Sequence, residues 1–318
     1  MDYLWGTVNQ RQEADFCLRT YFSKLGISVS DLIYKHIKSG FTDNVFMVST
    51  KSDNLNGVQT VIFKEYLENW HKKEITIYKK ILQHNYFLGS PKLIIAQPAF
   101  IILEFLSPKK TKPISAKHIN KLKDWLIKKH NHFKHAKTLD NFSEDESTQI
   151  HYLVDKPLNT LKNILPESSQ LTKILSFKDH FISTIEANNQ LPPTLEHGDL
   201  EPQNLFIDND DKLRVIDWVN SRKGSGLFDI NQYFETAEEL GCNLNRQYLI
   251  NQISKQIKLS NLKDMLLKVR QLMLLNKLNF YGEKYTQGKL NSFSKSKPTL
   301  TLFNKYLTEL QHSLDHNN

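Results

Sequence analysis

The spacing of hydrophobic residues divides the chain into two regions. In the first, short apolar segments alternate with polar turns, and residues 33–49 predict a β-hairpin whose tip lies at 39–44. Further strands are predicted at 59–64, 93–96 and 100–104. Short strands joined by short turns favour an antiparallel sheet. The first third of the chain is therefore predicted to be a small sheet domain.

The second region has a helical spacing of apolar residues. From Leu122 to Phe133 they recur at steps of three and four residues, which predicts a helix. Another helix is predicted over residues 169–188, because two consecutive prolines follow it as a stop signal. The second region is therefore predicted to be mainly helical, and the chain as a whole has an α+β pattern.

Polar residues suited to phosphoryl transfer surround a further predicted hairpin. Its short apolar strands, 205–207 and 213–216, are joined by an acidic turn, which returns Asp217 to the loop that contains Asp199 and Asn204. Phosphoryl transfer needs an aligned hydroxyl and Mg²⁺ held by oxygen ligands, with little covalent help from the protein. We predict that Asp199 accepts the hydroxyl proton and that Asn204 and Asp217 bind Mg²⁺.

The residues of this hairpin also carry a family resemblance. The string HGDLEPQN at 197–204, followed by IDW at 216–218, resembles the aminoglycoside phosphotransferase and choline kinase-like family. That family shares the two-lobed protein-kinase fold. The resemblance implies an N-terminal nucleotide-binding lobe at 1–106, with an antiparallel sheet and one helix. It implies a larger, mainly helical catalytic and acceptor-binding lobe at 107–318.

A lysine in the sheet region suits the phosphates of a nucleotide. Lys64 ends the predicted strand 59–64, and the helix predicted to start near Asn69 presents Glu74 on an amphipathic stretch. The resemblance implies that Lys64 neutralises the nucleotide phosphates and that Glu74 holds the lysine. The alternative for Glu74 is a solvated charge on a lysine-rich helix face.

Two segments are expected to complete the nucleotide site. Gly40 and Asn44 at the first hairpin's tip resemble the family loop that covers the phosphates, although a single glycine in a hairpin is often only a turn. Glu104, Phe105 and Leu106 resemble the hinge between the lobes, where backbone groups bind the adenine edge. The resemblance implies ATP as the donor and leaves GTP open.

Three residues near the catalytic loop are expected to support it. The resemblance implies that His197 buttresses the loop, and that Gly224 and Asp229 belong to an element in which the aspartate anchors the loop from a helix start. The alternative for Asp229 is an ordinary helix N-cap. Three other histidines lack the spacing and the acidic or cysteine neighbours of a metal site and are expected to be structural: His130, His132 and His135.

These features together predict an ATP- and Mg²⁺-dependent phosphotransferase that acts on a hydroxyl group of a small molecule, an antibiotic or a metabolite. An inactive kinase-like binding module is the alternative, but inactive relatives typically lose one of the four residues Lys64, Asp199, Asn204 and Asp217, which are all present. A protein kinase is disfavoured because HGD replaces HRD and no APE segment follows Asp217.

Composition and cysteine content indicate the cellular compartment in which this activity is expected. The 318 residues are 39% hydrophobic, enough for a core, and the first residues lack the basic start and apolar stretch of a signal peptide. The only cysteines, Cys17 and Cys242, lie far apart, which suits a reducing compartment. The longest apolar run, 93–106, is interrupted by a proline and contains Glu104. We expect a cytoplasmic protein without a membrane partner, and the oligomeric state stays open.

The net charge of +8 is unevenly distributed. Residues 151–240 hold 8 basic and 15 acidic side chains, whereas residues 241–318 hold 12 basic and 4 acidic ones. A basic C-terminal region disfavours a polycationic acceptor, unless acidic residues elsewhere line the acceptor pocket: Glu144, Asp145, Glu146, Glu235, Glu238 and Glu239. A neutral or anionic acceptor is the alternative. Nucleic-acid binding is disfavoured, because a lysine-rich solvated helix face explains the charge.

Overall fold

The computed structural model describes residues 8–39, 43–51, 59–66, 72–107, 116–242, 244–258, 261–291 and 297–315. The chain divides into two compact units. The first unit comprises Met1–Trp125 and Pro202–Ser221, and the second comprises Leu126–Glu201 and Arg222–Asn318. The lobe boundary expected between residues 106 and 107 stays a prediction.

A five-stranded antiparallel sheet forms the centre of the first unit. The sheet has the order β1-β2-β3-β5-β4, and its strands are β1 (Asp31–Ser39), β2 (Asp43–Lys51), β3 (Thr60–Tyr66), β4 (Leu93–Gln97) and β5 (Phe100–Glu104). Adjacent strands in the chain pair directly, except that β3 pairs with β5. The strands predicted from the apolar pattern are confirmed, each to within about two residues, as expected for element ends.

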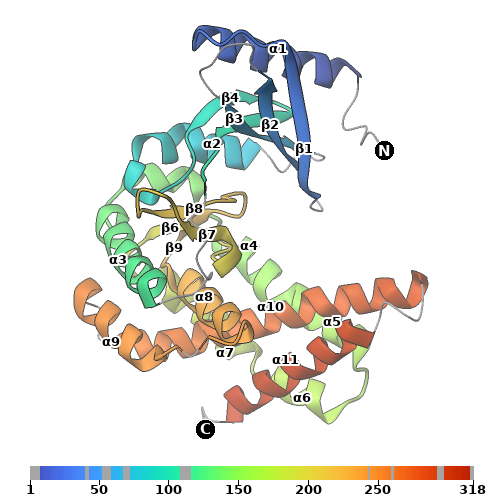
Figure 1. The fold of residues 1–318 in the computed structure, drawn as a ribbon. Helices are drawn as coiled ribbons and strands as arrows, with labels where there is room; N and C mark the ends of the chain where they lie inside the picture. The colour runs from blue at the N-terminus through green and yellow to red at the C-terminus, as the bar shows by residue number, and fades with distance from the viewer. Residues whose placement is uncertain are drawn as a thin grey trace. The chain divides into compact units, whose positions relative to one another are not determined.

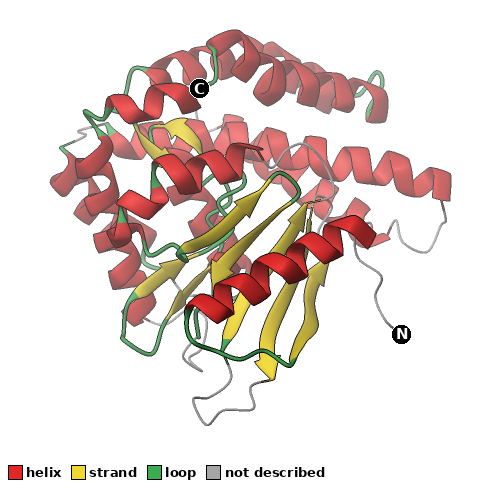
Figure 2. Cartoon of the chain, turned by 90° about the horizontal axis from the view of Figure 1, so that it is seen from above, coloured by secondary structure: helices red, strands yellow, loops and turns green. Residues whose placement is uncertain are grey.

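Two helices accompany this sheet. Helix α1 (Val8–Lys24) lies across one face, as Figure 2 shows. Its buried residues Ala14, Leu18 and Phe22 pack against sheet residues such as Phe63 in one apolar cluster. Helix α2 (Lys72–Lys80) follows β3 and carries Glu74 in its first turn. Two short 3₁₀ turns, Leu82–His84 and Tyr86–Leu88, then lead to β4.

The first unit also contains the predicted polar hairpin. Strands β7 (Leu205–Ile207) and β8 (Leu213–Val215) pair antiparallel after a 3₁₀ turn at Pro202–Asn204. The backbone of Val215 donates a hydrogen bond to the carbonyl of Gly89 at 3.2 Å, which ties the hairpin to the segment before β4. Trp218 is fully buried. The hairpin is therefore a fixed part of the same unit as the sheet.

The second unit is mainly helical (Figure 1). Helix α3 (Ala116–Phe133) leads into it, and its other helices are α4 (Glu146–Ile150), α5 (Lys156–Ile164), α6 (Ser169–Ser176), α7 (Lys178–Asn189), α8 (Leu227–Glu239), α9 (Arg246–Ile257), α10 (Leu262–Asn291) and α11 (Lys297–Asp315). Strands β6 (Thr194–Glu196) and β9 (Arg222–Gly224) form a small antiparallel ladder. Helices α5, α6, α7, α10 and α11 enclose one apolar core. None of the described helices is long and apolar enough to cross a membrane.

The single helix predicted over residues 169–188 is wrong in one respect, since the segment forms two helices that meet at Phe177. The Phe177 backbone has φ −94° and ψ 10°, and its N–H donates to Ile174 in a tightened turn. The Ser176 hydroxyl donates to the carbonyl of Lys173 at 2.7 Å and so competes with the helical hydrogen bonds. Neither glycine nor proline occurs at this break, and the apolar periodicity continues through it. The sequence pattern therefore predicted a single helix.

Candidate active site

A lysine between two carboxylates is the centre of polar contacts in the first unit. The Nζ atom of Lys64 on β3 lies 2.9 Å from Oε2 of Glu74 and 2.9 Å from Oδ1 of Asp217. The Tyr66 hydroxyl donates to the same Glu74 oxygen at 2.9 Å. Lys64 and Tyr66 share a face of β3 because side chains two residues apart point the same way. The predicted pair of Lys64 and Glu74 therefore exists in the structure, with Asp217 as a third member.

Burial distinguishes the members of this cluster. The Glu74 side chain is 1% exposed, whereas that of Asp217 is 23% exposed. Burial raises the pKa of Glu74, although the charge of Lys64 acts in the opposite direction. Asp217 is the carboxylate that remains accessible, and it is therefore the one that can exchange Lys64 for a ligand.

The cluster lines a cavity of about 350 Å³ within the first unit. Polar lining residues include Lys64, Glu74, Asp217 and Asn204. Much of the remaining lining is apolar: Ile37, Val45, Ile62, Leu103, Phe105, Leu106, Phe206 and Ile216. A mostly apolar cavity with a few convergent polar groups is typical of a small-molecule site.

The hairpin geometry brings the two predicted metal ligands together. Asn204 directly precedes β7 and Asp217 lies two residues beyond β8, and the N–H of Ile216 donates to the carbonyl of Asn204 at 3.0 Å. Both side chains line the cavity. Asp217 has φ 66°, a left-handed conformation that costs about 1–3 kcal/mol in a residue with a side chain and is concentrated at functional sites.

The donor set formed by Asn204 and Asp217 fits Mg²⁺, because an amide oxygen and a carboxylate oxygen are hard ligands. No group of three or more histidine, cysteine or acidic side chains suited to a metal occurs in the described part of the chain. A magnesium ion here would take its remaining ligands from water and from phosphate oxygens, as is usual for this ion.

The residues predicted to cover the nucleotide have mixed outcomes. Gly40 lies outside the described residues. Asn44 donates from its side chain to Glu65 at 3.0 Å across the β2–β3 pair, and its nucleotide-binding role stays a prediction. Glu104, Phe105 and Leu106 at the end of β5 all line the cavity, which places the predicted hinge beside its apolar part.

The second unit holds the predicted catalytic loop through a buried aspartate. Asp229 on α8 accepts hydrogen bonds from the backbone N–H of His197 at 2.8 Å and of Gly198 at 3.0 Å. Gly198 has φ 77°, so the loop turns through a conformation that glycine adopts readily. The ring nitrogen Nδ1 of His197 accepts the N–H of Asp199 at 3.2 Å. Gly226, three residues earlier, is the N-cap of α8, so Asp229 directs its carboxylate to the loop instead.

A buried lysine neutralises this aspartate. The Nζ atom of Lys129 on α3 lies 2.5 Å from Oδ2 of Asp229, and the two side chains are 1% and 0% exposed. Burial alone would raise the pKa of Asp229, but the charge of Lys129 and the hydrogen bonds of the loop hold that pKa below its usual value. The loop is therefore anchored by a carboxylate that stays ionised.

Asp199 is oriented from the same helix. The Gln232 side chain, one turn beyond Asp229, donates to Oδ1 of Asp199 at 2.9 Å and contacts Glu201 at 3.4 Å. Burial, followed by the negative charge of Asp199, raises the pKa of Glu201. The arrangement leaves one carboxylate, Asp199, held in a defined direction by a neutral amide.

Gly224 lies opposite Thr194 in the β6–β9 ladder. A Cβ atom at this position would come within 2.4 Å of the Glu196 carboxylate carbon. That carboxylate accepts Arg222 Nε at 3.0 Å and the N–H of Gly226 at 2.8 Å. A side chain at residue 224 would therefore displace the Glu196 carboxylate, which is held by Arg222 and Gly226. Glu196 directly precedes the predicted catalytic loop.

A family model decides the class of this arrangement. The model described as the phosphotransferase enzyme family matches residues 34–254, which is more than half of the chain. The chain belongs to this phosphotransferase family. The predicted family and the predicted enzyme class, a phosphotransferase, are thereby confirmed. No curated protein matches the chain.

Solved structures share the fold of this phosphotransferase. A choline kinase from Cryptosporidium parvum Iowa II is 17% identical with a TM-score of 0.67, and 97% of each chain is covered. The choline kinase LicA from Streptococcus pneumoniae is 15% identical with a TM-score of 0.61, covering 94% of this chain and 99% of that one. A gentamicin complex of APH(2″)-IIa is 14% identical with a TM-score of 0.60, with 97% of each chain covered. These similarities confirm the predicted kinase-like α+β fold.

Sequence reasoning missed four residues that contact the predicted site residues or line the cavity with them: Tyr66, Tyr78 (on α2, in the cavity lining), Lys129 and Gln232. Lys129 occupies a position in the apolar stripe between Leu122 and Phe133, and a charged residue there indicates a buried partner. The other three stand two, four and three residues from predicted site residues on the same strand or helix face. These spacings could have identified them as candidates.

Proposed function

We propose that the protein is an ATP-dependent O-phosphotransferase that transfers the γ-phosphate to a hydroxyl group of a small molecule. The supporting observation is Lys64, whose Nζ lies 2.9 Å from carboxylates 10 and 153 positions away in the chain. A cation between a buried and an accessible carboxylate, beside a cavity, is suited to bind phosphate once the accessible carboxylate turns to a metal ion.

The donor nucleotide occupies the cavity of the first unit in this proposal. Its base lies against the apolar residues near Phe105 and Leu106, and its phosphates reach Lys64. Glu74 keeps Lys64 in place. Asn204 and Asp217 hold Mg²⁺, which would neutralise charge on the phosphates during transfer. ATP is the proposed donor, and GTP is a second donor to be tested.

Asp199 acts on the acceptor in this proposal. A carboxylate directed by Gln232 can orient a hydroxyl and accept its proton as the oxygen attacks phosphorus. Asp229 and Lys129 keep the loop that carries Asp199 in one conformation. His197 and Gly224 support the same loop through its backbone and through Glu196.

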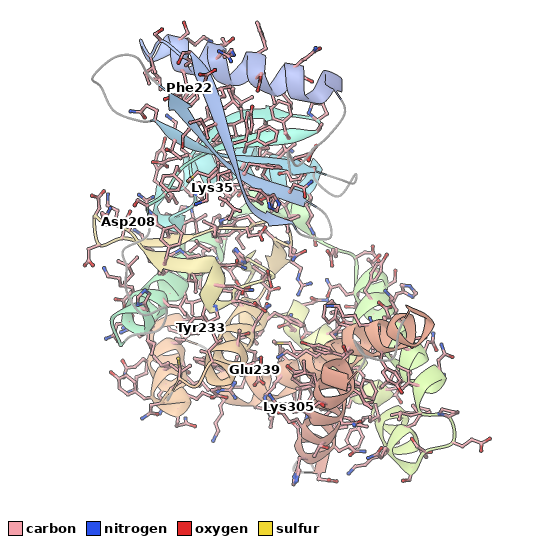
Figure 3. The ribbon with its side chains drawn as sticks, turned by 45° about the vertical axis from the view of Figure 1, so that its right-hand side comes forward. Phe22, Lys35, Asp208, Tyr233, Glu239 and Lys305 are labelled. Atoms are coloured by element: carbon pink, nitrogen blue, oxygen red, sulfur yellow. The ribbon has the colours of Figure 1, made fainter. Side chains whose placement is uncertain are left out.

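We propose a neutral or anionic acceptor, because two of the acidic residues that could attract a polycation, Glu235 and Glu239, already pair with basic side chains. Glu235 receives Arg246 at 2.7 Å and Arg270 at 2.6 Å. Glu239 lies 3.3 Å from Lys277 and 3.6 Å from Lys305, and Figure 3 labels Glu239 and Lys305 close together. Neutralised carboxylates offer little attraction to a polycationic antibiotic.

A screen of ADP release tests the proposal. Wild-type protein with Mg·ATP is offered aminoglycosides, uncharged antibiotics, amino alcohols, sugars and hydroxy acids. Asp199→Ala serves as the blank, and Asp179→Ala, an exposed substitution on α7, serves as the matched control. We expect acceptor-dependent ADP release by wild type and by the Asp179 variant, and none by the Asp199 variant. Equal release by the Asp199 variant contradicts the catalytic assignment.

The same screen distinguishes the acceptor classes and the setting. Faster turnover with aminoglycosides than with every other acceptor class would contradict the argument from paired carboxylates. Nucleotide binding without transfer to any acceptor would instead indicate a non-catalytic binding module. We place the enzyme in the cytoplasm, because Cys17 and Cys242 are free thiols, as is usual in a reducing compartment.

A further inference from the structure

One buried hydroxyl of the first unit has no hydrogen-bond partner in the described part of the chain. It belongs to Tyr78 on α2, whose side chain is 1% exposed. A buried polar group without a partner costs about 1–3 kcal/mol, so native structures rarely contain one without a reason. A ligand that supplies the partner would remove this cost.

The position of Tyr78 points to such a ligand. Tyr78 follows Glu74 by four residues on α2, so both side chains project from the same face of the helix. Both line the cavity of the first unit, together with Lys64 and Asp217. The unpaired hydroxyl therefore lies near the charged residues that line the cavity.

The hydroxyl is a hydrogen-bond donor under physiological conditions. Burial, followed by the negative charge of Glu74, raises the pKa of Tyr78 well above its usual value. The neutral phenol keeps its proton and can donate it to an oxygen of a ligand.

Tyr66 provides an internal comparison. Its hydroxyl donates to Glu74 at 2.9 Å, on the same oxygen that receives Lys64. Two tyrosines thus approach one ion-pair cluster, and one of them is paired by the protein whereas the other is not. Structural support explains Tyr66, but it does not explain a phenol at residue 78, where phenylalanine would fill the same space without an unpaired polar atom.

We propose that Tyr78 is a ligand-binding residue whose hydroxyl donates a hydrogen bond to an oxygen of the nucleotide's phosphate chain, beside Lys64. This inference rests on the proposed function. The phosphates are favoured over the base, because the charged groups Lys64, Glu74 and Asp217 act electrostatically on Tyr78, whereas apolar lining residues such as Phe105 and Leu106 suit a base.

Nucleotide titrations of Tyr78→Phe test the proposal. Affinity for Mg·ADP is measured by calorimetry, and affinity for adenosine is measured by displacement of a fluorescent ADP analogue. We expect Tyr78→Phe to bind Mg·ADP about 3- to 10-fold more weakly, as the loss of one hydrogen bond predicts. Adenosine affinity should be unchanged. The melting temperature of the ligand-free variant should equal or exceed that of wild type, because the unpaired hydroxyl is gone.

Two control variants complete the test. Tyr66→Phe loses a satisfied hydrogen bond and should melt at a lower temperature than wild type. Tyr86→Phe changes a tyrosine that is 82% exposed and should match wild type in affinity and melting temperature. Equal Mg·ADP affinity of Tyr78→Phe and wild type overturns the inference, as does an equal loss of affinity for adenosine. If wild type itself does not bind Mg·ADP, the result contradicts the proposed function, and the role of Tyr78 falls with it.

Discussion

Two buried lysines, one in each unit, form ion pairs with different surroundings. Lys64 contacts two carboxylates, of which Asp217 is 23% exposed and borders a cavity. Lys129 contacts Asp229, and this pair is 1% and 0% exposed. Asp229 also accepts hydrogen bonds from backbone N–H groups of the predicted catalytic loop. An ion pair at a cavity can exchange one partner for a ligand, whereas a sealed pair can only hold the backbone around it.

The carboxylates of the two clusters differ as well. The pKa of Glu74 is raised by burial, whereas the pKa of Asp229 is lowered, because Lys129 and the loop outweigh its burial. Removal of the lysine should therefore have different consequences. Glu74 can take up a proton with little cost, but Asp229 would remain a buried charge whose partner is lost.

The largest expected effect is that of Lys129→Met on stability. We expect a loss of about 3–5 kcal/mol in the free energy of unfolding at pH 7, because Asp229 is left as an unpaired buried charge. Urea denaturation followed by circular dichroism measures this loss. Lys128→Met, at an exposed position of the same helix, is the matched control and should change stability by less than about 1 kcal/mol. Similar urea midpoints for the two variants would contradict a structural role for Lys129.

The next effect is that of Lys64→Met on activity. Turnover should fall by about 10²- to 10³-fold, as for the loss of one preorganised charge at a transition state. The loss of unfolding free energy should be smaller than for Lys129→Met. Lys79→Met, exposed on α2, should retain wild-type turnover. The comparison between the lysines breaks down if Lys64→Met mainly destabilises the protein and leaves turnover intact.

A third prediction concerns pH. In wild type the lowered pKa of Asp229 gives stability that is present above the unfolded-state pKa and is lost as pH falls through the folded-state pKa. In Lys129→Met, burial should raise the pKa of Asp229. The destabilisation caused by the unpaired buried charge is therefore relieved as pH falls through that raised value and the carboxylate takes up a proton. Below that raised pKa, the difference in the free energy of unfolding between wild type and Lys129→Met should narrow by about 1.4 kcal/mol for each pH unit. Unfolding curves at pH 7, 6 and 5 measure this difference, and a constant difference would contradict the assignment to Asp229.

The smallest effect is expected for Gly224→Ala. The new Cβ would lie 2.4 Å from the Glu196 carboxylate carbon, and overpacking of this kind costs about 1–3 kcal/mol. Lys223→Ala removes an exposed ion pair with Asp140 in the same strand and should cost less than about 1 kcal/mol. Thermal melts of the two variants decide the point. A smaller loss for Gly224→Ala than for Lys223→Ala would show that Glu196 moves aside without cost.

The sheet and the β7–β8 hairpin could be predicted from sequence because local patterns specify them. Short apolar segments between polar turns identify β2, β3, β7 and β8, and the acidic turn between β7 and β8 returns Asp217 to Asn204. The pairing of Lys64 with Glu74 followed from the family resemblance together with the strand and helix patterns.

Tertiary packing explains what the sequence did not reveal. The break at Phe177 depends on a serine side chain and a tightened turn, without the glycine or proline that usually marks a helix end. Lys129 finds its partner 100 residues away, and Gln232 reaches Asp199 from another helix. Side-chain partners at such separations follow from the folded arrangement and leave only indirect signals in the sequence.

The central claim is that the accessible carboxylate of the Lys64 cluster binds a metal ion with the nucleotide. Calorimetric titration of ADP with and without Mg²⁺ tests it most directly, using wild type, Asp217→Gly and the exposed control Asp210→Ala. Glycine removes the carboxylate and tolerates the left-handed backbone of residue 217. We predict that Mg²⁺ strengthens ADP binding by wild type and the Asp210 variant and has no effect on the Asp217 variant. Equal strengthening in all three proteins would contradict the account.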